Sequence, residues 1–547
     1  MTTPSMFIES PSGRPAAGGS LEWIRALAMP TDGFVGADVR IDGESVPFAA
    51  RWLPDEVAIS GWCDTRGLPP GLHEISVVGR WEDDIEATAT MLLSVEPGEP
   101  AGWWATPHYE GELPAVAMVG APDLRHRLAR AALAGTPLVV LDDAAQLGDG
   151  ALERIALAFA DERAVDVVIG DDAGPLPPHR WMRWRKPALQ PEALPCVDQV
   201  GPLIAVGPRA ADILCDTLPA EPSVYGIALE LLDRGLESVC LAHVLATTQE
   251  PRLPADTTAE RALIARLAER REQPVRIDPG PVAGVRDVRW PLTVPPRVTA
   301  VIPSRTPDHV ERCLTGVAEH NDYPALDVVV VDSGSDPGGM ERAAQAAGVP
   351  ATVVPYPAGQ GFNYQRAVNL GSAAAGQAHV LFLNDDVTPL VDDWLTRMVE
   401  LLMLPRVGIV GAYLFFPDGR IQHAGVRIGE GTSHLYHDAP GDARGHRFEL
   451  LAPANPHAVT GACMLVRREL LDELGGHDPR YTHVYGDVDL CFRAKAAGWR
   501  TAWCAGARLE HAESASYGRA YDTGDVARFE ADWHGGRGPM STNRVRI

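Results

Sequence analysis

The part of the chain that most restricts its fold runs from residue 298 to residue 386, where apolar runs alternate with helical patterns. The runs are VTAVIP, LDVVVVDSGS, ATVVPY and HVLFLNDD, and segments such as DHVERCLTGVAEH and FNYQRAVNLGSAAAG separate them. Strands that are apolar on both faces need helices on both sides of their sheet. The pattern therefore predicts an α/β fold with a doubly wound sheet, whose ligands bind at the carboxyl ends of the strands.

Two further regions precede this one, because 547 residues are too many for a single core. Residues 1–100 contain short alternating runs separated by Gly, Pro and Asp turns, which predict a β-sandwich-like domain. Residues 101–290 again alternate apolar strands with helices, which predicts an α/β domain with a parallel sheet. The doubly wound sheet then belongs to a third domain, residues 291–547.

Charge and composition argue against several classes of protein. The formal net charge of −25 would repel nucleic acid, and no apolar stretch reaches the length of a membrane span. The N-terminus lacks the basic and apolar regions of a signal peptide, and the eight cysteines contain no C-x-x-C pair. We therefore expect a cytoplasmic protein with reduced, mostly buried cysteines and no structural zinc site.

Two phrases of the sequence are near copies of each other. VYGDVDLCFR carries two aspartates, whereas the earlier SVYGIALELL has apolar residues in their places. Gly201 precedes Gly226 by 25 residues, and Gly461 precedes Gly486 by the same 25. PLVVLDDAAQL matches VLFLNDDVTPL in the same order along the chain. Three such matches predict that residues 101–290 are a duplicated copy of the third domain.

The earlier copy has lost the acids of the later one. A partly desolvated acid at a strand end costs folding energy, and function explains its retention. The earlier copy also has no room for an opening strand–helix–strand unit before AVAMVG. We therefore expect residues 101–290 to be degenerate and non-catalytic. The acids and their counterparts are Asp386 and Ala144, Asp487 and Ile227, and Asp489 and Leu229.

Polar side chains follow three apolar strands of the third domain. Ser304 and Asp332 end two of them, and Asn384, Asp385 and Asp386 follow another. Clustered carboxylates at a carboxyl edge can hold a hard divalent cation, which in turn neutralises a diphosphate. Asn and Asp are also favoured as helix N-caps, so the cluster alone leaves both interpretations open.

Two later residues are further candidates for chemistry. Asp487 is predicted at the start of a helix whose Leu490, Cys491 and Ala494 turn inward. It is either a helix cap or, because apolar surroundings favour proton uptake, a general base. His511, in LEHAESAS, is either a structural histidine or a metal ligand.

Taken together, these features resemble a known family. From Val298 to about Gly518 the chain is similar to family 2 glycosyltransferases, within them most to the bacterial rhamnosyltransferase and O-antigen or cell-wall glycan group. The phrases that carry the resemblance are VIPSRT, VVVVDSGS, FLNDDV, GRIQHAGV, AVTGACMLVRR, GDVDLCFRAKAAGW and HAESASYG. Residues 137–250 resemble the same family more faintly, in DVVIGDD and RKPALQPEAL.

The resemblance implies a GT-A-type fold, a UDP- or dTDP-linked sugar as donor, and an inverting mechanism. Two departures from the commonest pattern are Asn384, in place of the first Asp of D-x-D, and Gly486, where many relatives have Glu. By position, the resemblance implies that Pro303, Ser304 and Arg305 line the nucleotide pocket and that Asp332 contacts the base. Asn384, Asp385 and Asp386 occupy the D-x-D position, and Asp386 and His511 would ligate Mn²⁺ or Mg²⁺. Asp487 would be the general base, and Thr460, Gly461 and Ala462 would lie between donor sugar and acceptor.

The expected acceptor is a glycan or a lipid-linked glycan. Peripheral contact with the inner face of the membrane, or with other glycan-assembly proteins, is compatible with these expectations. A processive synthase is disfavoured, because the third domain has no Q-x-x-R-W signature. The alternatives are a non-catalytic carbohydrate-binding or scaffolding protein, which would not need the retained acids, and a nucleotidyltransferase, for which PSRTPDH offers only Arg305 to a triphosphate.

Overall fold

The computed structural model falls into two units, Met1–Glu110 and Gly111–Ile547, which we describe separately. It describes residues 5–10, 16–17, 21–29, 34–41, 44–46, 49–52, 57–64, 71–81, 85–96, 111–160, 165–176, 180–184, 186–249, 256–359, 361–428, 432–512, 523–534 and 544–546. Among these residues, no helix has both the length and the apolar character needed to cross a membrane.

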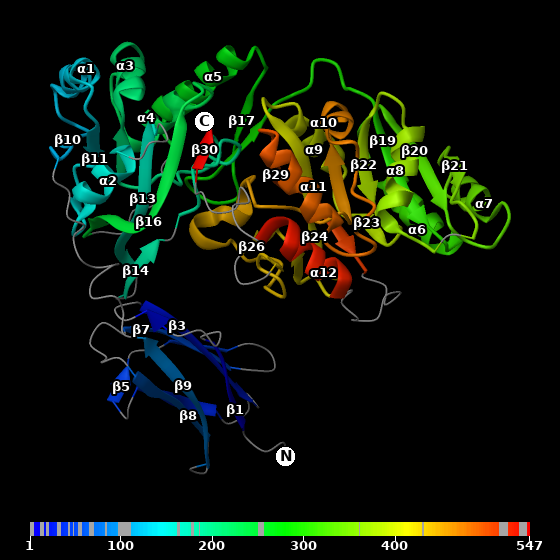
Figure 1. Ribbon diagram of the computed structural model, residues 1–547, viewed down its shortest axis with the longest axis horizontal. Coiled ribbons are helices and arrows are strands. Elements are labelled where there is room, and N and C mark those ends of the chain that lie inside the picture. Colours follow the sequence, from blue (N-terminus) through cyan, green and yellow to red (C-terminus); the bar gives the residue numbers. More distant parts are fainter. Residues whose placement is uncertain are drawn as a thin grey trace. The chain divides into compact units, whose positions relative to one another are not determined.

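The first unit consists of β-strands in two sheets (Figure 1). Val39 and Val77 are buried and lie opposite each other in adjacent strands. Packing of the two sheets into a sandwich stays a prediction, because most side chains of this unit lie outside the description. One sheet has the order β1 (Ser5–Ser10), β3 (Leu21–Met29), β7 (Val57–Asp64) and β6 (Ala49–Trp52); the other has β2 (Ala16–Ala17), β9 (Ile85–Glu96), β8 (Gly71–Trp81), β4 (Phe34–Ile41) and β5 (Glu44–Val46).

The second unit contains two α/β sheets, and the later one has the order β21-β20-β19-β22-β28-β24-β29-β23. Its elements, here called the second α/β segment, are β19 (Val298–Ser304), α6 (Pro307–Glu319), β20 (Leu326–Asp332), α7 (Gly339–Ala346), β21 (Thr352–Pro355), α8 (Tyr364–Ala374), β22 (His379–Leu383), β23 (Val387–Pro389), α9 (Trp394–Leu402), β24 (Val407–Phe415), β25 (Ile421–His423), β26 (Val426–Ile428), β27 (Thr432–His434), η3 (His446–Leu451), β28 (Cys463–Val466), α10 (Arg468–Leu474), α11 (Gly486–Ala496), β29 (Arg500–His511), α12 (Thr523–Phe529) and η4 (Glu530–His534).

Helices cover both faces of this sheet, as its apolar strands predict. On β22, Leu381 and Leu383 belong to one buried core, with side chains of α6 and α9. The alternate residues Val380 and Phe382 belong to a separate core, with side chains of α8 and α11. The predicted α/β class is therefore confirmed for this segment.

The sheet is mixed rather than all parallel, because β28, β23 and the short β25 run antiparallel to their neighbours. β28 runs antiparallel to both of its neighbours, β22 and β24. The long connection after β25 brings the chain back beside the carboxyl end of β22, where Cys463 at the start of β28 pairs with Leu383. β28 therefore runs in the direction opposite to β22. Apolar periodicity reports burial and not strand direction, so the sequence could not distinguish the two.

The earlier α/β sheet repeats most of this topology. Its strands β10-β11-β15-β13-β16-β12 have the same pairwise directions as β19-β22-β28-β24-β29-β23. The elements of this first α/β segment are β10 (Ala115–Met118), α1 (Leu124–Ala134), β11 (Leu138–Leu141), β12 (Ala145–Leu147), α2 (Ala151–Ala160), β13 (Val167–Leu176), β14 (Arg180–Trp184), β15 (Leu203–Val206), α3 (Pro208–Thr217), α4 (Val224–Leu231), β16 (Glu237–Thr248), α5 (Thr258–Arg271), β17 (Arg276–Pro279) and β18 (Arg286–Arg289).

Strand register extends the match to single residues. Ala145 pairs with Thr248 as Val387 pairs with His511, so Ala144 and Asp386 precede matching positions. The first α/β segment also has a mixed sheet, not the parallel one expected. The first segment lacks equivalents of β20, α7 and β21. In the second segment these elements follow β19, the equivalent of β10, so the missing unit lies after the first strand and not before it, where the sequence predicts it. The common strand order supports the predicted duplication.

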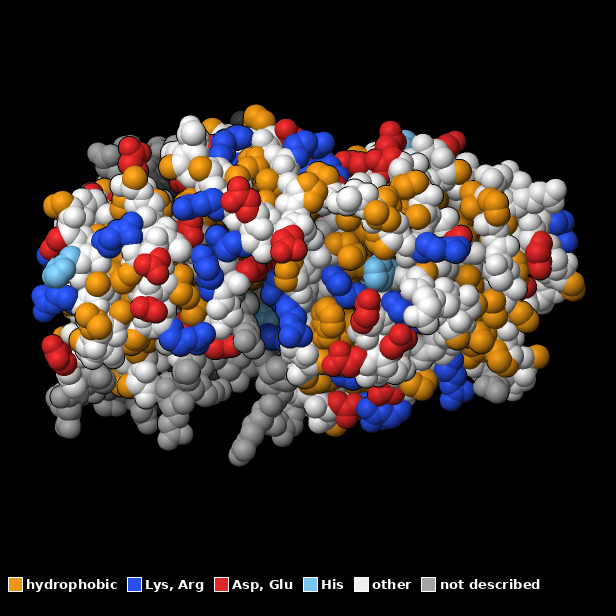
Figure 2. Space-filling view, turned by 90° about the horizontal axis from the view of Figure 1, so that it is seen from above, with side chains coloured by type: hydrophobic (Ala, Val, Ile, Leu, Met, Phe, Trp, Pro, Cys, Tyr) orange, Lys and Arg blue, Asp and Glu red, His pale blue; other side chains and the backbone are white. Residues whose placement is uncertain are grey.

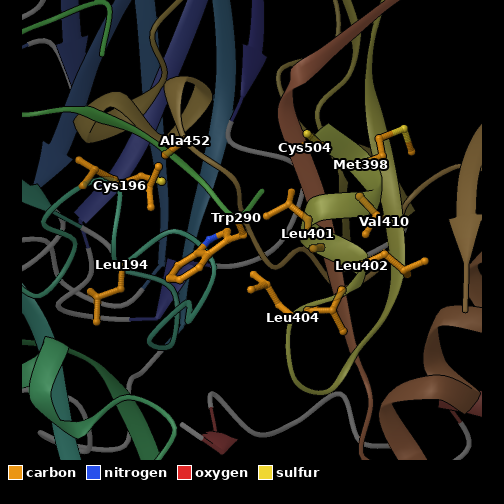
Figure 3. Close-up of a cluster of buried hydrophobic side chains, with 14 of the residues drawn as sticks. Leu194, Cys196, Trp290, Met398, Leu401, Leu402, Leu404, Val410, Ala452 and Cys504 are labelled. Carbon is orange, nitrogen blue, oxygen red and sulfur yellow. The ribbon is translucent and has the colours of Figure 1, made fainter. Parts of the chain in front are cut away.

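The two α/β segments share buried contacts. Figure 3 shows Leu194 and Cys196 of the first segment near Trp290, with Leu401 and Leu404 from the α9 region of the second on its other side. A C-terminal strand, β30 (Arg544–Arg546), pairs with β16 of the first segment. Six of the seven cysteines whose burial the structure describes are buried, as predicted. Figure 2 shows basic and acidic side chains interspersed over the face in view.

Candidate active site

The carboxyl ends of β19, β20 and β22 bring three predicted residues together. Ser304 lies opposite Asp332 in the parallel register, and its Oγ donates a hydrogen bond to Asp385 Oδ2 at 2.5 Å. Burial raises the pKa of Asp385; the bond from Ser304 opposes this shift, and the charge of Asp386 adds to it. Two adjacent carboxylates at a buried strand end form a site that favours a cation.

The residues expected around the nucleotide lie along the same edge. Pro303 is buried in β19 and Arg305 is exposed directly beyond it. Asp332 Oδ1 accepts a hydrogen bond from the backbone N–H of Gly334 at 2.8 Å, which turns the chain at the end of β20. The same loop lies against β19, where Ser333 donates to the Ser304 carbonyl at 2.8 Å.

Asp386 and His511 meet where β23 pairs with β29. His511 Nε2 lies 3.2 Å from Asp386 Oδ1. His511 Nδ1 lies 2.6 Å from Gln422 Oε1, and Gln422 Nε2 donates to the His511 carbonyl at 3.4 Å. Because an amide oxygen only accepts, Nδ1 donates to Gln422, and this bond directs Nε2 toward Asp386.

That arrangement fits a divalent cation. An imidazole whose Nδ1 proton is held by an acceptor, next to a carboxylate, is the donor set of many metal sites. Within the described part of the chain, no three His, Cys, Asp or Glu side chains are grouped to hold a metal. Asp386 and His511 would hold such a cation together with oxygen atoms of a bound diphosphate or water.

Asp487 lies on the first turn of α11 and faces the strand end of β28. Its Oδ2 accepts a hydrogen bond from the Gly461 N–H, and its Oδ1 accepts one from the Val488 N–H, both at 2.8 Å. Leu490 and Ala494 of the same helix are fully buried, as predicted, whereas Asp487 is half-buried. The acid is thus held in place but accessible.

The chain enters α11 in a strained conformation that the matching helix lacks. Tyr485 has φ 64°, whereas α4 of the first segment already includes its counterpart Tyr225. A non-glycine residue in this region costs about 1–3 kcal/mol and persists where surrounding structure enforces it. Gly486 follows, and a Cβ there would lie 2.3 Å from the buried side chain of Gln365. This contact explains why a residue with a side chain does not fit at this position.

Tyr364 joins the two sides of the site, and sequence reasoning missed it. Its hydroxyl lies 3.1 Å from Asn384 Oδ1 and 3.4 Å from the Gly461 carbonyl. Burial raises its pKa, and the charges of Asp487, Asp385 and Asp386 raise it further, so the hydroxyl stays protonated. An aromatic residue at the start of a helix looks like core in the sequence, so no local signal identified this role.

The predicted segment Thr460–Ala462 completes the arrangement. The Asn384 N–H donates to the Ala462 carbonyl at 2.9 Å, and the Thr460 N–H donates to His423 Nε2 at 3.3 Å. Burial lowers the pKa of His423 well below its usual value, which keeps that acceptor neutral. His423 and Gln422 belong to GRIQHAGV, a phrase noted in the sequence without roles for these residues.

The candidate site is thus a strand edge with clustered acids that lies across Gly461 from the half-buried Asp487. Residues 295–523 match the family described as glycosyltransferase like family 2. This segment of the chain is therefore a family 2 glycosyltransferase domain, which confirms the resemblance found in the sequence. We call it the glycosyltransferase domain below.

Several known proteins are similar to parts of the chain. Uncharacterized protein y4gI of Sinorhizobium fredii is 35% identical over 285 residues, 51% of this chain and 31% of that protein. O-antigen biosynthesis protein RfbC of Myxococcus xanthus is 29% identical over 392 residues, 68% of this chain and 30% of that protein. The chain thus spans less than a third of either relative.

Two further similarities concern shorter proteins. The N-acetylglucosaminyl-diphospho-decaprenol L-rhamnosyltransferase of Mycobacterium tuberculosis is 28% identical over 246 residues, which are 41% of this chain and 77% of the relative. The structure of the mannosyltransferase PcManGT from Pyrobaculum calidifontis, in complex with GDP-Man and Mn²⁺, covers 51% of this chain and 73% of its own, with 22% identity and a TM-score of 0.33.

Proposed function

We propose that the glycosyltransferase domain is inverting and moves a sugar from a nucleotide-diphosphate sugar to a hydroxyl of a glycan or lipid-linked glycan. Asp487 takes the proton of the acceptor hydroxyl, the hydroxyl oxygen bonds to the anomeric carbon, and the bond from that carbon to the nucleoside diphosphate breaks. Proton, nucleophile and leaving group are then all accounted for. UDP- or dTDP-linked sugars are the proposed donors.

The observation that carries this proposal is the connection between Asp487 and Asn384. Asp487 is bonded to Gly461, and Tyr364 lies within hydrogen-bond distance of both Gly461 and Asn384. The proposed base and the proposed diphosphate side are thereby held in a fixed relation, as a displacement with opposed entering and leaving groups requires.

The proposed metal site lies on the leaving-group side. Asp386 and His511 would hold Mn²⁺ or Mg²⁺, and the cation would neutralise charge on the departing diphosphate. Asp385 is instead bonded to Ser304, which supports a positioning role at the nucleotide rather than direct ligation.

The names of the relatives support the acceptor class. One is named for O-antigen biosynthesis and another for transfer of rhamnose to a polyprenol-linked sugar. By analogy, we propose that this chain acts in the cytoplasm on a glycan or lipid-linked glycan, at the inner face of the membrane or beside other glycan-assembly proteins.

Release of nucleoside diphosphate from a panel of nucleotide sugars, measured with several glycan acceptors, tests this function. We expect turnover with at least one UDP- or dTDP-sugar, its loss in EDTA, and its return with Mn²⁺ or Mg²⁺. Full turnover in excess EDTA would contradict the metal site. Glycan binding without turnover of any donor would favour the non-catalytic scaffold instead.

Replacing Asp332 should affect donor binding more than chemistry. We expect Asp332→Ala to raise the donor KM about tenfold and to change kcat less than about twofold, because a base contact is equal in ground and transition states. Asp332→Asn is the matched control, because it keeps an oxygen for the Gly334 turn but loses one acceptor. If Asn restores the wild-type KM, the residue supports only the turn.

A further inference from the structure

The first α/β segment has an ion cluster that includes a residue of the glycosyltransferase domain. Asp172, at the carboxyl side of β13, lies 2.7 Å from Lys186 Nζ and 2.6 Å from Arg447 Nη2. The three side chains are 2%, 3% and 12% exposed. Asp172 thus forms ion pairs with two largely buried cations, and removing one member would leave a buried charge without one of its partners.

The Lys186 ammonium lies beside Gly201 of the first α/β segment. Its Nζ donates to the Val200 carbonyl at 2.5 Å, and a Cβ on Gly201 would lie 2.4 Å from it. Gly201 is the counterpart of Gly461, whose N–H instead holds Asp487. Burial lowers the pKa of Lys186, and the charge of Asp172 opposes that shift. In the first segment, the ion pair of Lys186 with Asp172 therefore lies beside Gly201.

Arg447 reaches this cluster from a strained turn in the connection between β27 and β28. Arg447 and Phe448 have φ values of 48° and 65°. The Arg447 guanidinium also stacks 4.6 Å from the ring of Trp184. Two successive non-glycine residues in this conformation need external support, and Asp172 and Trp184 provide it.

The same connection leads to the proposed acceptor side. Glu449 accepts a hydrogen bond from Tyr436, which anchors the two parts of the connection to each other. Leu450 is buried in the core that contains Val488 of α11. Thr460 and Gly461 then follow and contact His423 and Asp487.

We propose that Asp172, with Lys186, holds the Arg447 turn and thereby positions the acceptor side of the glycosyltransferase domain. The degenerate segment would then be a positioning element of the catalytic one rather than an independent module. The kinetic part of this inference rests on the proposed function, whereas the structural part does not.

Two variants separate the structural part from general damage. Arg447→Met removes the cation at the rim of the cluster, and Asp172→Asn weakens the pair from the other side. Arg209→Met is the matched control, because Arg209 pairs with another buried acid of the first segment, Asp166, at 2.9 Å. Trypsin cleavage of the full-length native chain after exposed Arg444, followed by mass spectrometry, reports opening of the turn.

We expect Arg447→Met and Asp172→Asn each to speed this cleavage about tenfold, the double variant no more than either, and Arg209→Met to have no effect. Unchanged cleavage in Arg447→Met, or an equal increase in Arg209→Met, overturns the tether. If Asp172→Asn does not fold, Arg447→Met decides the matter alone.

With an active donor and acceptor, Arg447→Met should raise the acceptor KM about fivefold and leave the donor KM within about twofold. An unchanged acceptor KM overturns the positioning role even if cleavage rises. A wild-type chain without transferase activity contradicts the proposed function and the kinetic role together, while the cleavage result still decides the tether.

Discussion

Asp487→Asn should lower turnover about a hundredfold or more while nucleotide-sugar affinity changes little. The amide keeps the shape of the side chain and an oxygen that can accept from the Gly461 N–H, so the surroundings of α11 are preserved. It cannot take a proton from an acceptor hydroxyl. Turnover at saturating donor and acceptor, with donor affinity from titration calorimetry, gives the measurement. An active Asp487→Asn enzyme would refute the assignment of the base.

The first α/β segment supplies a control for that experiment. Ile227, the counterpart of Asp487, is fully buried in α4. Ile227→Asp should lower the free energy of unfolding by roughly 3 kcal/mol, because it buries an unpaired acid, and should create no second activity. Ile227→Val should cost little stability and leave kcat unchanged. A lower kcat in Ile227→Val at unchanged melting temperature would mean that the first segment takes part in chemistry.

Asp386→Ala should reduce kcat/KM about a hundredfold or more at low metal concentration, because it removes one of the two proposed protein ligands. Excess Mn²⁺ should restore part of this loss, since His511 and the diphosphate can still bind the ion. Dependence of the initial rate on Mn²⁺ concentration gives the measurement.

Another acid–histidine pair provides the matched control for the metal site. His320 Nδ1 lies 2.8 Å from Asp392 Oδ1 at the surface of the same domain. Asp392→Ala should leave the Mn²⁺ dependence unchanged. Wild-type metal dependence in Asp386→Ala would remove this residue from the proposed site, and equal defects in both variants would indicate general destabilisation.

Local patterns in the sequence predicted the parts of the fold and site that depend on neighbouring residues. The apolar run before Asn384 predicted β22 and the position of the acids at its end. The pattern of GDVDLCFR predicted α11, with Asp487 at its start. Both predictions depend on periodicity and spacing over a few residues, which a single sequence contains.

Contacts between distant segments could not be predicted in the same way. Tyr364 reaches Asn384 and Gly461 only after α8 has packed against the sheet. Gln422 acquires its place beside His511 through the pairing of β24 with both β25 and β29. The antiparallel direction of β28 likewise depends on the path of a long connection, about which periodicity carries no information.

The pairing of β30 with β16 has a consequence for synthesis of the protein. The two strands lie on opposite sides of the entire glycosyltransferase domain in the sequence. On the ribosome, β16 emerges first and must wait for the whole domain to be translated before residues 544–546 can pair with it. During that interval the backbone N–H and C=O groups of residues 237–239 that pair with β30 are open to other nascent chains. Slower translation between the two strands would lengthen this exposure, so chaperone demand should rise with translation time.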